Sequence, residues 1–282
     1  MEKRILDHKA VCTLLPQRNP YTHKGDYGKI LLICGSLGYT GAAALASMGA
    51  LRSGAGLVYL AVPECIYAIE AAKLTEPIVL PLPDEDGKVS KAAYKDICTL
   101  LQGKDAVLIG PGIGQSEGTL AAVRTVLESF SGPVVLDADG INVICAHTDI
   151  LRGREAPTIL TPHDGEFFRL GGSLSHGRLE GAAELAKTLG VIVLLKGHET
   201  LITDGNLCYE NHTGNAGMAV GGSGDVLAGI LVSLLGQALP PMEAAACAAY
   251  LHGAAGDICR DEIGEYGMLP TDMLNALPRL LK

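Results

Sequence analysis

Short unbroken runs of apolar residues recur along this chain, and each of them ends at a glycine or a polar loop. The first run covers residues 29–35 and reads Lys-Ile-Leu-Leu-Ile-Cys-Gly. Runs without alternation of apolar and polar positions are typical of strands that are buried on both faces of a parallel sheet. The further runs that we interpret as strands cover residues 57–62, 106–110, 133–137, 158–161 and 191–196.

Segments with helical spacing lie between these runs. Residues 42–52 and 118–130 are the clearest early helix candidates, and a shorter candidate lies within residues 1–28. Helices close the chain at about 226–236, 242–260 and 271–281. Alternating strands and helices predict a three-layer α/β fold, with a mostly parallel central sheet and helices on both faces.

The pattern near residue 200 predicts a hairpin. Residues 201–205 and 207–210 flank Asp204-Gly-Asn206, which has good turn chemistry. We find no linker, low-complexity tract or repeat that would divide the sequence. We therefore expect residues 1–282 to form a single domain.

Composition and charge limit the possible partners. Of the 282 residues, 48% are hydrophobic and 19% are charged, which allows a large core. The net charge of −9 argues against nucleic acid or an anionic membrane as partner, and no apolar run is long enough to span a bilayer. The eight cysteines form no Cys-x-x-Cys pair, and no signal peptide is evident. We expect a cytoplasmic protein with reduced thiols and no zinc site.

Residues 219–235 contain the most informative stretch. Gly221, Gly222 and Gly224 stand directly before an apolar helical run. The first amides of a helix have no partner within the helix, and its N-terminus is partly positive, so this turn predicts an anion site made of backbone. Asp225 lies at its mouth. The local sequence leaves two interpretations open with about even odds: an N-cap, or a base that takes a proton from a hydroxyl.

Polar residues with possible chemistry follow several predicted strands. The loops begin with Asp137-Ala-Asp139, with Thr161-Pro-His163-Asp-Gly-Glu166 and with Lys196-Gly-His-Glu-Thr200. Because ligands bind such sheets beyond the carboxyl ends of the strands, these loops are the expected place for residues with chemistry. Plainer interpretations exist for each of them: a turn with a helix cap, a structural histidine, and a lysine that extends from the sheet edge to solvent.

Two helical residues do not fit this grouping. His252 and Asp257 lie five positions apart on a predicted helix, which is a poor spacing for one helix face. We interpret them as structural or interfacial.

The segment Gly222-Ser-Gly-Asp225 resembles the GTGD-type anion-hole motif of the ribokinase-like superfamily. Read with the strand-end loops, nearly the whole chain is similar to the ADP-dependent NAD(P)H-hydrate dehydratases within that superfamily. Sugar and vitamin kinases carry Asn-x-x-Glu where this chain has His163 and Glu166, and dehydratases have His there. The resemblance implies a ribokinase-like fold and repair of hydrated NADH or NADPH with ADP as phosphoryl donor.

The resemblance also implies roles for individual residues. Asp225 would be the catalytic base, and Glu166 would hold Mg²⁺. The residues implied in substrate binding are Ala42, Gly112, Gly114, His163 and Asp225. Those implied in nucleotide binding are Lys196, Gly197, His198, Glu199, Thr200, Gly222, Ser223 and Gly224. A homo-oligomer, with a tetramer favoured, is implied as well. Because the first dehydratase motif lies so near residue 1, we expect no epimerase domain before it.

Two other functions remain open at this point. A vitamin or sugar kinase of the same superfamily would stop at the phosphorylated alcohol. A regulatory nucleotide-binding protein would need the glycine turn but not an acid beside it.

Overall fold

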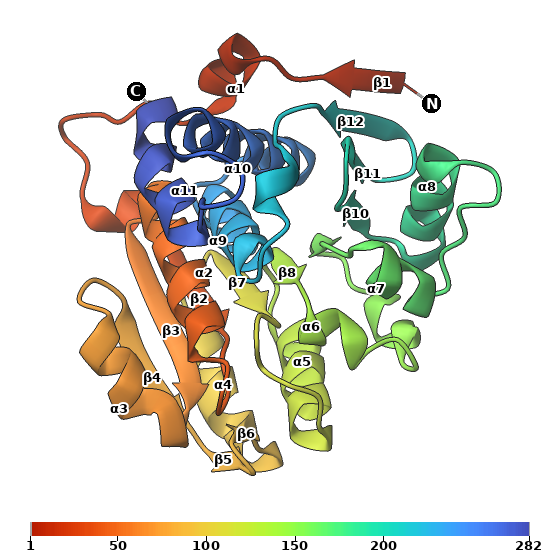
Figure 1. The fold of residues 1–282 in the computed structure, drawn as a ribbon. Coiled ribbons are helices and arrows are strands. Elements are labelled where there is room, and N and C mark those ends of the chain that lie inside the picture. Colours follow the sequence, from red (N-terminus) through yellow and green to blue (C-terminus); the bar gives the residue numbers. More distant parts are fainter. Residues whose placement is uncertain (1, 282) are drawn as a thin grey trace.

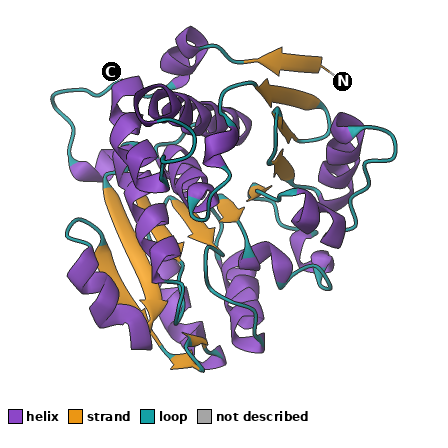
Figure 2. Ribbon diagram, viewed as in Figure 1, coloured by secondary structure: helices purple, strands orange, loops and turns teal. Residues whose placement is uncertain are grey.

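The computed structural model describes residues 2–281, and its centre is a sheet of ten strands with helices against both faces (Figures 1 and 2). The spatial order is β1-β12-β11-β10-β9-β8-β7-β2-β3-β4. The strands are β1 (Glu2–Ile5), β2 (Lys29–Ile33), β3 (Leu57–Pro63), β4 (Ile78–Leu82), β7 (Ala106–Ile109), β8 (Val134–Leu136), β9 (Thr158–Leu160), β10 (Ile192–Leu195), β11 (Thr200–Thr203) and β12 (Leu207–Asn211). A separate pair consists of β5 (Asp84–Glu85) and β6 (Lys88–Val89).

The predicted strands and the mostly parallel sheet are confirmed. Neighbouring strands run parallel, except that β11 is antiparallel to both β10 and β12. The predicted hairpin is the β11–β12 pair, with Thr203 opposite Cys208. Strand β1, which pairs with β12, was not predicted, since its residues are exposed, three of the four are charged, and they carry no apolar pattern.

The helices form the two outer layers. They are α1 (His8–Leu14), α2 (Thr40–Arg52), α3 (Glu64–Lys73), α4 (Tyr94–Leu101), α5 (Glu117–Ser129), α6 (Asp139–Asn142), α7 (Asp164–Arg169), α8 (Arg178–Leu189), α9 (Ser223–Gly236), α10 (Pro241–Ile263) and α11 (Pro270–Ala276). Short 3₁₀ turns are η1 (Lys24–Tyr27), η2 (Lys91–Ala93), η3 (Thr148–Leu151), η4 (Ala216–Met218) and η5 (Leu277–Leu280). No helix among residues 2–281 has the length and apolar character needed to cross a membrane.

Each central strand contributes to two hydrophobic cores. In β2, Ile30 and Leu32 pack with α2, α9 and α10, whereas Leu31 and Ile33 pack with α4 and α5 on the opposite face. Successive side chains of a strand point to opposite faces. An unbroken apolar run therefore satisfies both cores, and this is why the strands could be recognised from the sequence.

Helices α2 and α9 are in close contact, although they are far apart in sequence (Figure 1). A Cβ atom added to Gly229 would lie 2.1 Å from the backbone oxygen of Ala46, and one added to Gly49 would lie 2.7 Å from that of Val226. Larger residues would force the helices apart. The glycines thus hold α9 against α2, and they place the N-terminus of α9 at the carboxyl ends of the central strands.

Candidate functional site

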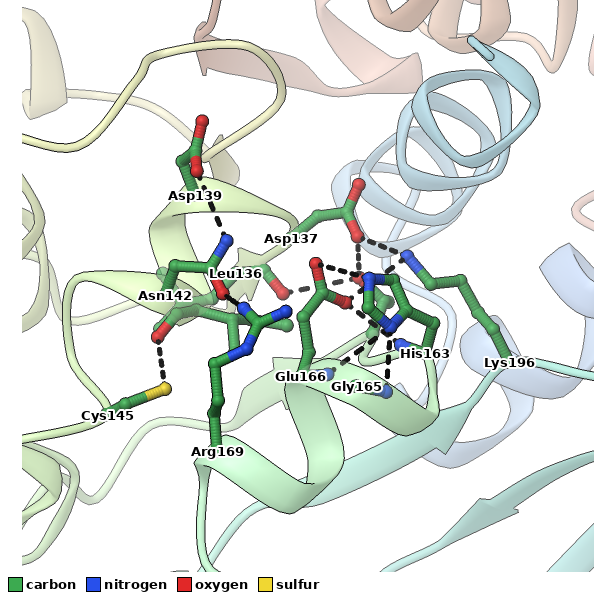
Figure 3. A network of polar contacts seen from close by, with 12 residues as sticks. Leu136, Asp137, Asp139, Asn142, Cys145, His163, Gly165, Glu166, Arg169 and Lys196 are labelled. Atoms are coloured by element: carbon green, nitrogen blue, oxygen red, sulfur yellow. Dashed lines mark hydrogen bonds and ion pairs between the residues drawn. The ribbon is translucent and has the colours of Figure 1, made fainter. Parts of the chain in front are cut away.

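Three strand ends bring a buried carboxylate, a hydroxyl and an ammonium group together. Asp137 follows β8, Thr161 follows β9 and Lys196 follows β10. The Nζ atom of Lys196 lies 2.8 Å from Oδ1 of Asp137 (Figure 3). The hydroxyl of Thr161 donates to the same oxygen at 2.7 Å. The loops after β8, β9 and β10 therefore meet at this group. The partner of Lys196 was not predicted, because a contact between distant positions leaves no local pattern.

The loop after β9 forms a capping box at the start of α7. Nδ1 of His163 accepts a hydrogen bond from the amide of Gly165 at 2.9 Å, and the Glu166 carboxylate accepts one from the amide of His163 at 2.9 Å. Glu166 is almost fully buried and lies 3.9 Å from Nζ of Lys196. His163 is thus the N-cap of α7, a role that was not predicted, and its ring remains half exposed.

Helix α9 begins earlier than predicted. Its first residue is Ser223 and its N-cap is Gly222, which has a φ of +97° and makes no side-chain cap. Asp225 is therefore the third residue of the helix, so the interpretation of Asp225 as N-cap is wrong. A Cβ atom at Gly222 would lie 2.4 Å from the side chain of Leu45, which explains the need for glycine. The first-turn amides have no capping side chain, which is the condition for an anion site.

Asp225 has an unusual protonation equilibrium. The pKa of its carboxyl is raised to about 7: burial raises it most, the nearby charge of Asp137 also raises it, and Lys196 partly opposes both. Burial alone would lower the pKa of Lys196, but the carboxylates of Asp137 and Glu166 outweigh that effect and the pKa is raised. The cation therefore remains charged beside an acid that exchanges its proton near neutral pH. A pKa near the working pH is what a general base requires.

A cavity of about 930 Å³ opens beside this group. Its size suits a nucleotide or a ligand of similar bulk. Predicted residues that line it are His163, Lys196, Gly197, His198, Glu199, Thr200, Ser223 and Gly224. Residues that were not predicted also line it; they come from the loop 211–220 and from α10, namely Ala249, His252 and Gly253. The structure therefore gathers most of the predicted nucleotide residues around one cavity.

Ala42, Gly112 and Gly114 lie apart from the lining of that cavity. A Cβ atom on Gly112, which has a φ of +64°, would lie 2.7 Å from the Cβ atom of Ala42, so these two residues do lie together. The amide of Gly114 donates to the Asp139 carboxylate at 3.1 Å. Asp139 also begins α6 and accepts from Asn142 at 3.2 Å (Figure 3). It holds the glycine turn after β7 against the loop after β8.

Comparison with known proteins decides the family. A sequence model described as NAD(P)H-hydrate dehydratase matches residues 30–279. The chain is 38% identical to the ADP-dependent (S)-NAD(P)H-hydrate dehydratase of Bacillus subtilis, over 95% of this chain and 94% of that protein. The chain belongs to the NAD(P)H-hydrate dehydratase family. It is also 42% identical, over 99% of its length, to the bifunctional NAD(P)H-hydrate repair enzyme of Moorella thermoacetica. It spans about half the length of such bifunctional relatives, 54% in that case.

Solved structures agree with this family assignment. The ADP/ATP-dependent NAD(P)H-hydrate dehydratase of Bacillus subtilis, co-crystallised with ATP and Mg²⁺, has a TM-score of 0.84 at 35% identity, covering 97% of this chain and 96% of that one. A ribokinase-like superfamily protein from Enterococcus faecalis has a TM-score of 0.86 at 27% identity, covering 99% and 95%. The predicted ribokinase-like fold is confirmed.

His252 and Asp257, which we interpreted from the sequence as structural or interfacial, lie at the site. Nε2 of His252 lies 2.9 Å from the backbone oxygen of Ser223, the first residue of α9. The Asp257 carboxylate accepts from the amide of Gly214 at 2.9 Å and from Nδ2 of Asn215 at 3.1 Å. Their five-residue spacing indicated only that the two side chains do not share one face of the helix. Each instead contacts a different wall of the cavity, which no local pattern reveals.

Proposed function

We propose that this chain catalyses the ADP-dependent dehydration of the S epimer of hydrated NADH or NADPH, with release of AMP and phosphate. Its family and the Bacillus subtilis relative support this reaction. The observation that carries the chemistry is the position of Asp225. Its carboxyl, with a pKa of about 7, lies in the first turn of a helix that no side chain caps, near the partly buried cation of Lys196. An acid at an anion site is repulsive unless it acts on the reacting group.

The first step is a phosphoryl transfer. Asp225 takes the proton from the hydroxyl of the hydrated nicotinamide ring, and that oxygen attacks the terminal phosphorus of ADP. The bond between this phosphorus and its bridging oxygen breaks, and AMP leaves. The amides at Gly222, Ser223 and Gly224 and the N-terminus of α9 stabilise the charge that develops on the phosphoryl oxygens.

The second step is an elimination. Hydroxide is a poor leaving group at neutral pH, whereas phosphate is a good one. The lone pair of the ring nitrogen expels phosphate from the adjacent carbon, and loss of a ring proton restores the double bond of the dihydronicotinamide. One hydrated cofactor and one ADP thus give one reduced cofactor, one AMP and one phosphate. No electrons are gained or lost overall.

Magnesium fits this site only with help from the nucleotide. No group of three or more His, Cys, Asp or Glu side chains in residues 2–281 is arranged to hold a metal ion. Mg²⁺, however, commonly keeps several waters and takes one or two carboxylates plus substrate phosphates. Glu166, almost fully buried and near Lys196, is the carboxylate that we assign to it. The ion would offset charge on the phosphates.

The two substrates are assigned to two groups of residues. We propose that ADP contacts the segment 196–200 together with Gly222, Ser223 and Gly224, because most of these residues line the cavity of about 930 Å³. We propose that the hydrated cofactor contacts Ala42, Gly112, Gly114, His163 and Asp225. We further propose a single domain, a cytoplasmic location and a homo-oligomer, with a tetramer favoured.

The alternatives are less well supported. A kinase of this superfamily would carry Asn where this chain has His163, and relatives named as dehydratases extend over nearly the whole chain. A regulatory nucleotide-binding protein would have no use for a buried carboxyl with a pKa of about 7 beside the phosphates. Product analysis separates a kinase from a dehydratase, since only the latter restores the reduced nicotinamide.

The deciding experiment is an absorbance assay. The protein is incubated with hydrated NADH, Mg²⁺ and either ADP or ATP, and the absorbance of the reduced nicotinamide is followed while AMP and phosphate are measured. We expect the absorbance to return faster with ADP than with ATP, and we expect AMP and phosphate in equal amounts. Equal or faster rates with ATP would contradict the preference for ADP. A phosphorylated cofactor that accumulates without return of absorbance would indicate a kinase.

A further inference from the structure

A histidine on α10 is bonded to the first residue of the helix that carries Asp225. Nε2 of His252 lies 2.9 Å from the backbone oxygen of Ser223 and 3.2 Å from its hydroxyl. A carbonyl oxygen can only accept, so Nε2 carries the hydrogen and donates it. The proton is therefore on Nε2, and Nδ1 carries none in the neutral ring. Ser223 is itself buried, so its bond to His252 is shielded from water.

The ring of His252 is neutral at ordinary pH. Burial lowers its pKa to about 4, and the positive charge of Lys196 lowers it as well, while the bond to Ser223 opposes this. A neutral ring adds no second cation beside the phosphates. What it supplies is one directed hydrogen bond to the Ser223 carbonyl in the first turn of α9.

The contacts around the first turn of α9 indicate what the hydrogen bond from His252 does. Gly229 lies against the backbone of Ala46, and Gly49 lies against that of Val226, so close backbone packing positions α9 on its α2 side. His252 approaches the same turn from α10, where it lines the cavity. The amides that would face a phosphate come directly before and after the bonded carbonyl. A shift of Ser223 would move these amides and Asp225 together.

We propose that His252 is a positioning residue for the reaction, which holds the Ser223 carbonyl so that the first-turn amides and the Asp225 carboxylate face the terminal phosphate. This inference rests on the proposed function. It deepens that function, because it assigns the alignment of the anion site to a side chain that acts through the backbone of Ser223 and not on the reacting atoms. Asp257, further along α10, accepts hydrogen bonds from Gly214 and Asn215, which also line the cavity. Helix α10 therefore contacts two separate parts of the cavity lining.

Three variants test this proposal in the full chain. His252→Leu removes the donor at similar size. His252→Gln keeps an N–H donor at similar reach. Ala255→Gly is the matched control, because Ala255 is buried on α10, does not line the cavity, and glycine weakens the helix without touching a polar contact. We measure kcat and KM with hydrated NADH and ADP, the melting temperature, and amide hydrogen exchange of the peptide that covers residues 222–227.

We expect His252→Leu to lower kcat roughly 10-fold, the effect of one lost hydrogen bond to backbone. KM for hydrated NADH should change much less, and exchange in 222–227 should become faster. His252→Gln should recover most of kcat and of the protection. Ala255→Gly should lower the melting temperature while it leaves kcat and the exchange of 222–227 near wild type.

Several outcomes would overturn the proposal. One is wild-type kcat and exchange in His252→Leu. Another is an equal loss of kcat in the Leu and Gln variants. A third is an equal loss of kcat in Ala255→Gly, which would mean that His252 contributes only to the general stability of the helix. If the wild-type protein fails to restore hydrated NADH, the proposed function fails instead. The exchange data then still decide whether His252 holds the turn, and faster exchange in His252→Leu alone would support it.

Discussion

The ammonium group of Lys196 lies 2.8 Å from a carboxylate oxygen of Asp137, across 59 positions of sequence. Thr161 donates to the same oxygen at 2.7 Å, so the carboxylate is held by a cation and a hydroxyl in a buried place. Asp137 raises the pKa of Asp225, and Lys196 lowers it. The charges of Asp137 and Lys196 therefore adjust the pKa of Asp225, the proposed base beside the phosphate site.

Removing the charge of Asp137 should change the pH dependence of turnover. In Asp137→Asn, one of the two influences that raise the pKa of Asp225 is absent, while the opposing charge of Lys196 remains. The pKa of Asp225 should fall, and the rise of kcat/KM with pH should move to lower pH. The measurement is a pH profile of kcat/KM at saturating Mg²⁺. Stability should also drop, by about 1–3 kcal/mol, because Lys196 loses a buried partner.

Asp139→Asn is the matched control for this shift. It removes one negative charge from the same loop, but the Asp139 carboxylate contacts Gly114 and Asn142 rather than Lys196. Its profile should keep the wild-type midpoint even if its rate falls. An unchanged midpoint in Asp137→Asn, or equal shifts in both variants, would contradict the role of Asp137.

The wild-type enzyme should itself respond to pH near neutrality. Asp225 acts as base only when ionised, and its pKa is about 7, raised mainly by burial. Because kcat/KM reports the free enzyme, it should be low at pH 6, rise with a midpoint near pH 7 and level off above it. Hydrated NADH and ADP assays across this range measure the curve. A flat profile between pH 6 and 8 would separate Asp225 from the proton transfer.

How well the sequence predicted each feature depends on how far apart along the chain the interacting residues lie. The strands were predictable because β2 and its neighbours are buried on both faces, which leaves an unbroken apolar run. The loops with chemistry were predictable because parallel strands end at one edge of the sheet. Helix α9 was recognised as well, yet its first residue was placed three positions late, since Ser223 and Gly224 carry no apolar signal.

What the sequence did not reveal depends on contacts between distant segments. The pairing of Lys196 with Asp137 and the bond from His252 to Ser223 join separate elements. Periodicity within one element carries no information about either. Asp225 illustrates the difference: its place near the glycine turn was readable, whereas its pKa arises from burial and from the charge of Asp137, which only the fold supplies.

His163 can be tested without disturbing the helix that it caps. His163→Asn keeps a good N-cap for α7 and removes only the ring, whose exposed side faces the cavity. We expect KM for hydrated NADH to rise roughly 10-fold, as for one lost polar contact. The melting temperature and the affinity for ADP, measured by calorimetric titration, should stay near wild type.

His163→Ala provides the comparison, because it removes both the ring and the cap. Its KM should match that of the Asn variant, while its stability should fall by about 1 kcal/mol. His163 lines the same cavity as the segment 196–200. Loss of ADP affinity in the Asn variant, with KM for hydrated NADH unchanged, would therefore move His163 to the nucleotide.

Asp225→Asn tests the catalytic base. Asparagine keeps the size and an acceptor oxygen, but it cannot take the proton. Turnover should fall by roughly 10²–10⁴-fold. Affinity for ADP should hold or improve slightly, because a negative charge near the phosphates is gone. Steady-state rates and calorimetric titration with ADP measure the two effects on one variant.

The stability of Asp225→Asn at different pH values tests the pKa of Asp225 independently of turnover. The unfolded chain releases the Asp225 proton near the ordinary value of 3.8, whereas the folded chain keeps it until about pH 7. Folding is therefore penalised progressively as pH rises through this window, and the penalty is complete above it. Asparagine carries no such penalty, so the melting temperature at pH 8 should hold or rise, with little change at pH 4. Near wild-type turnover in Asp225→Asn would leave the mechanism without its base, whatever the melting temperature.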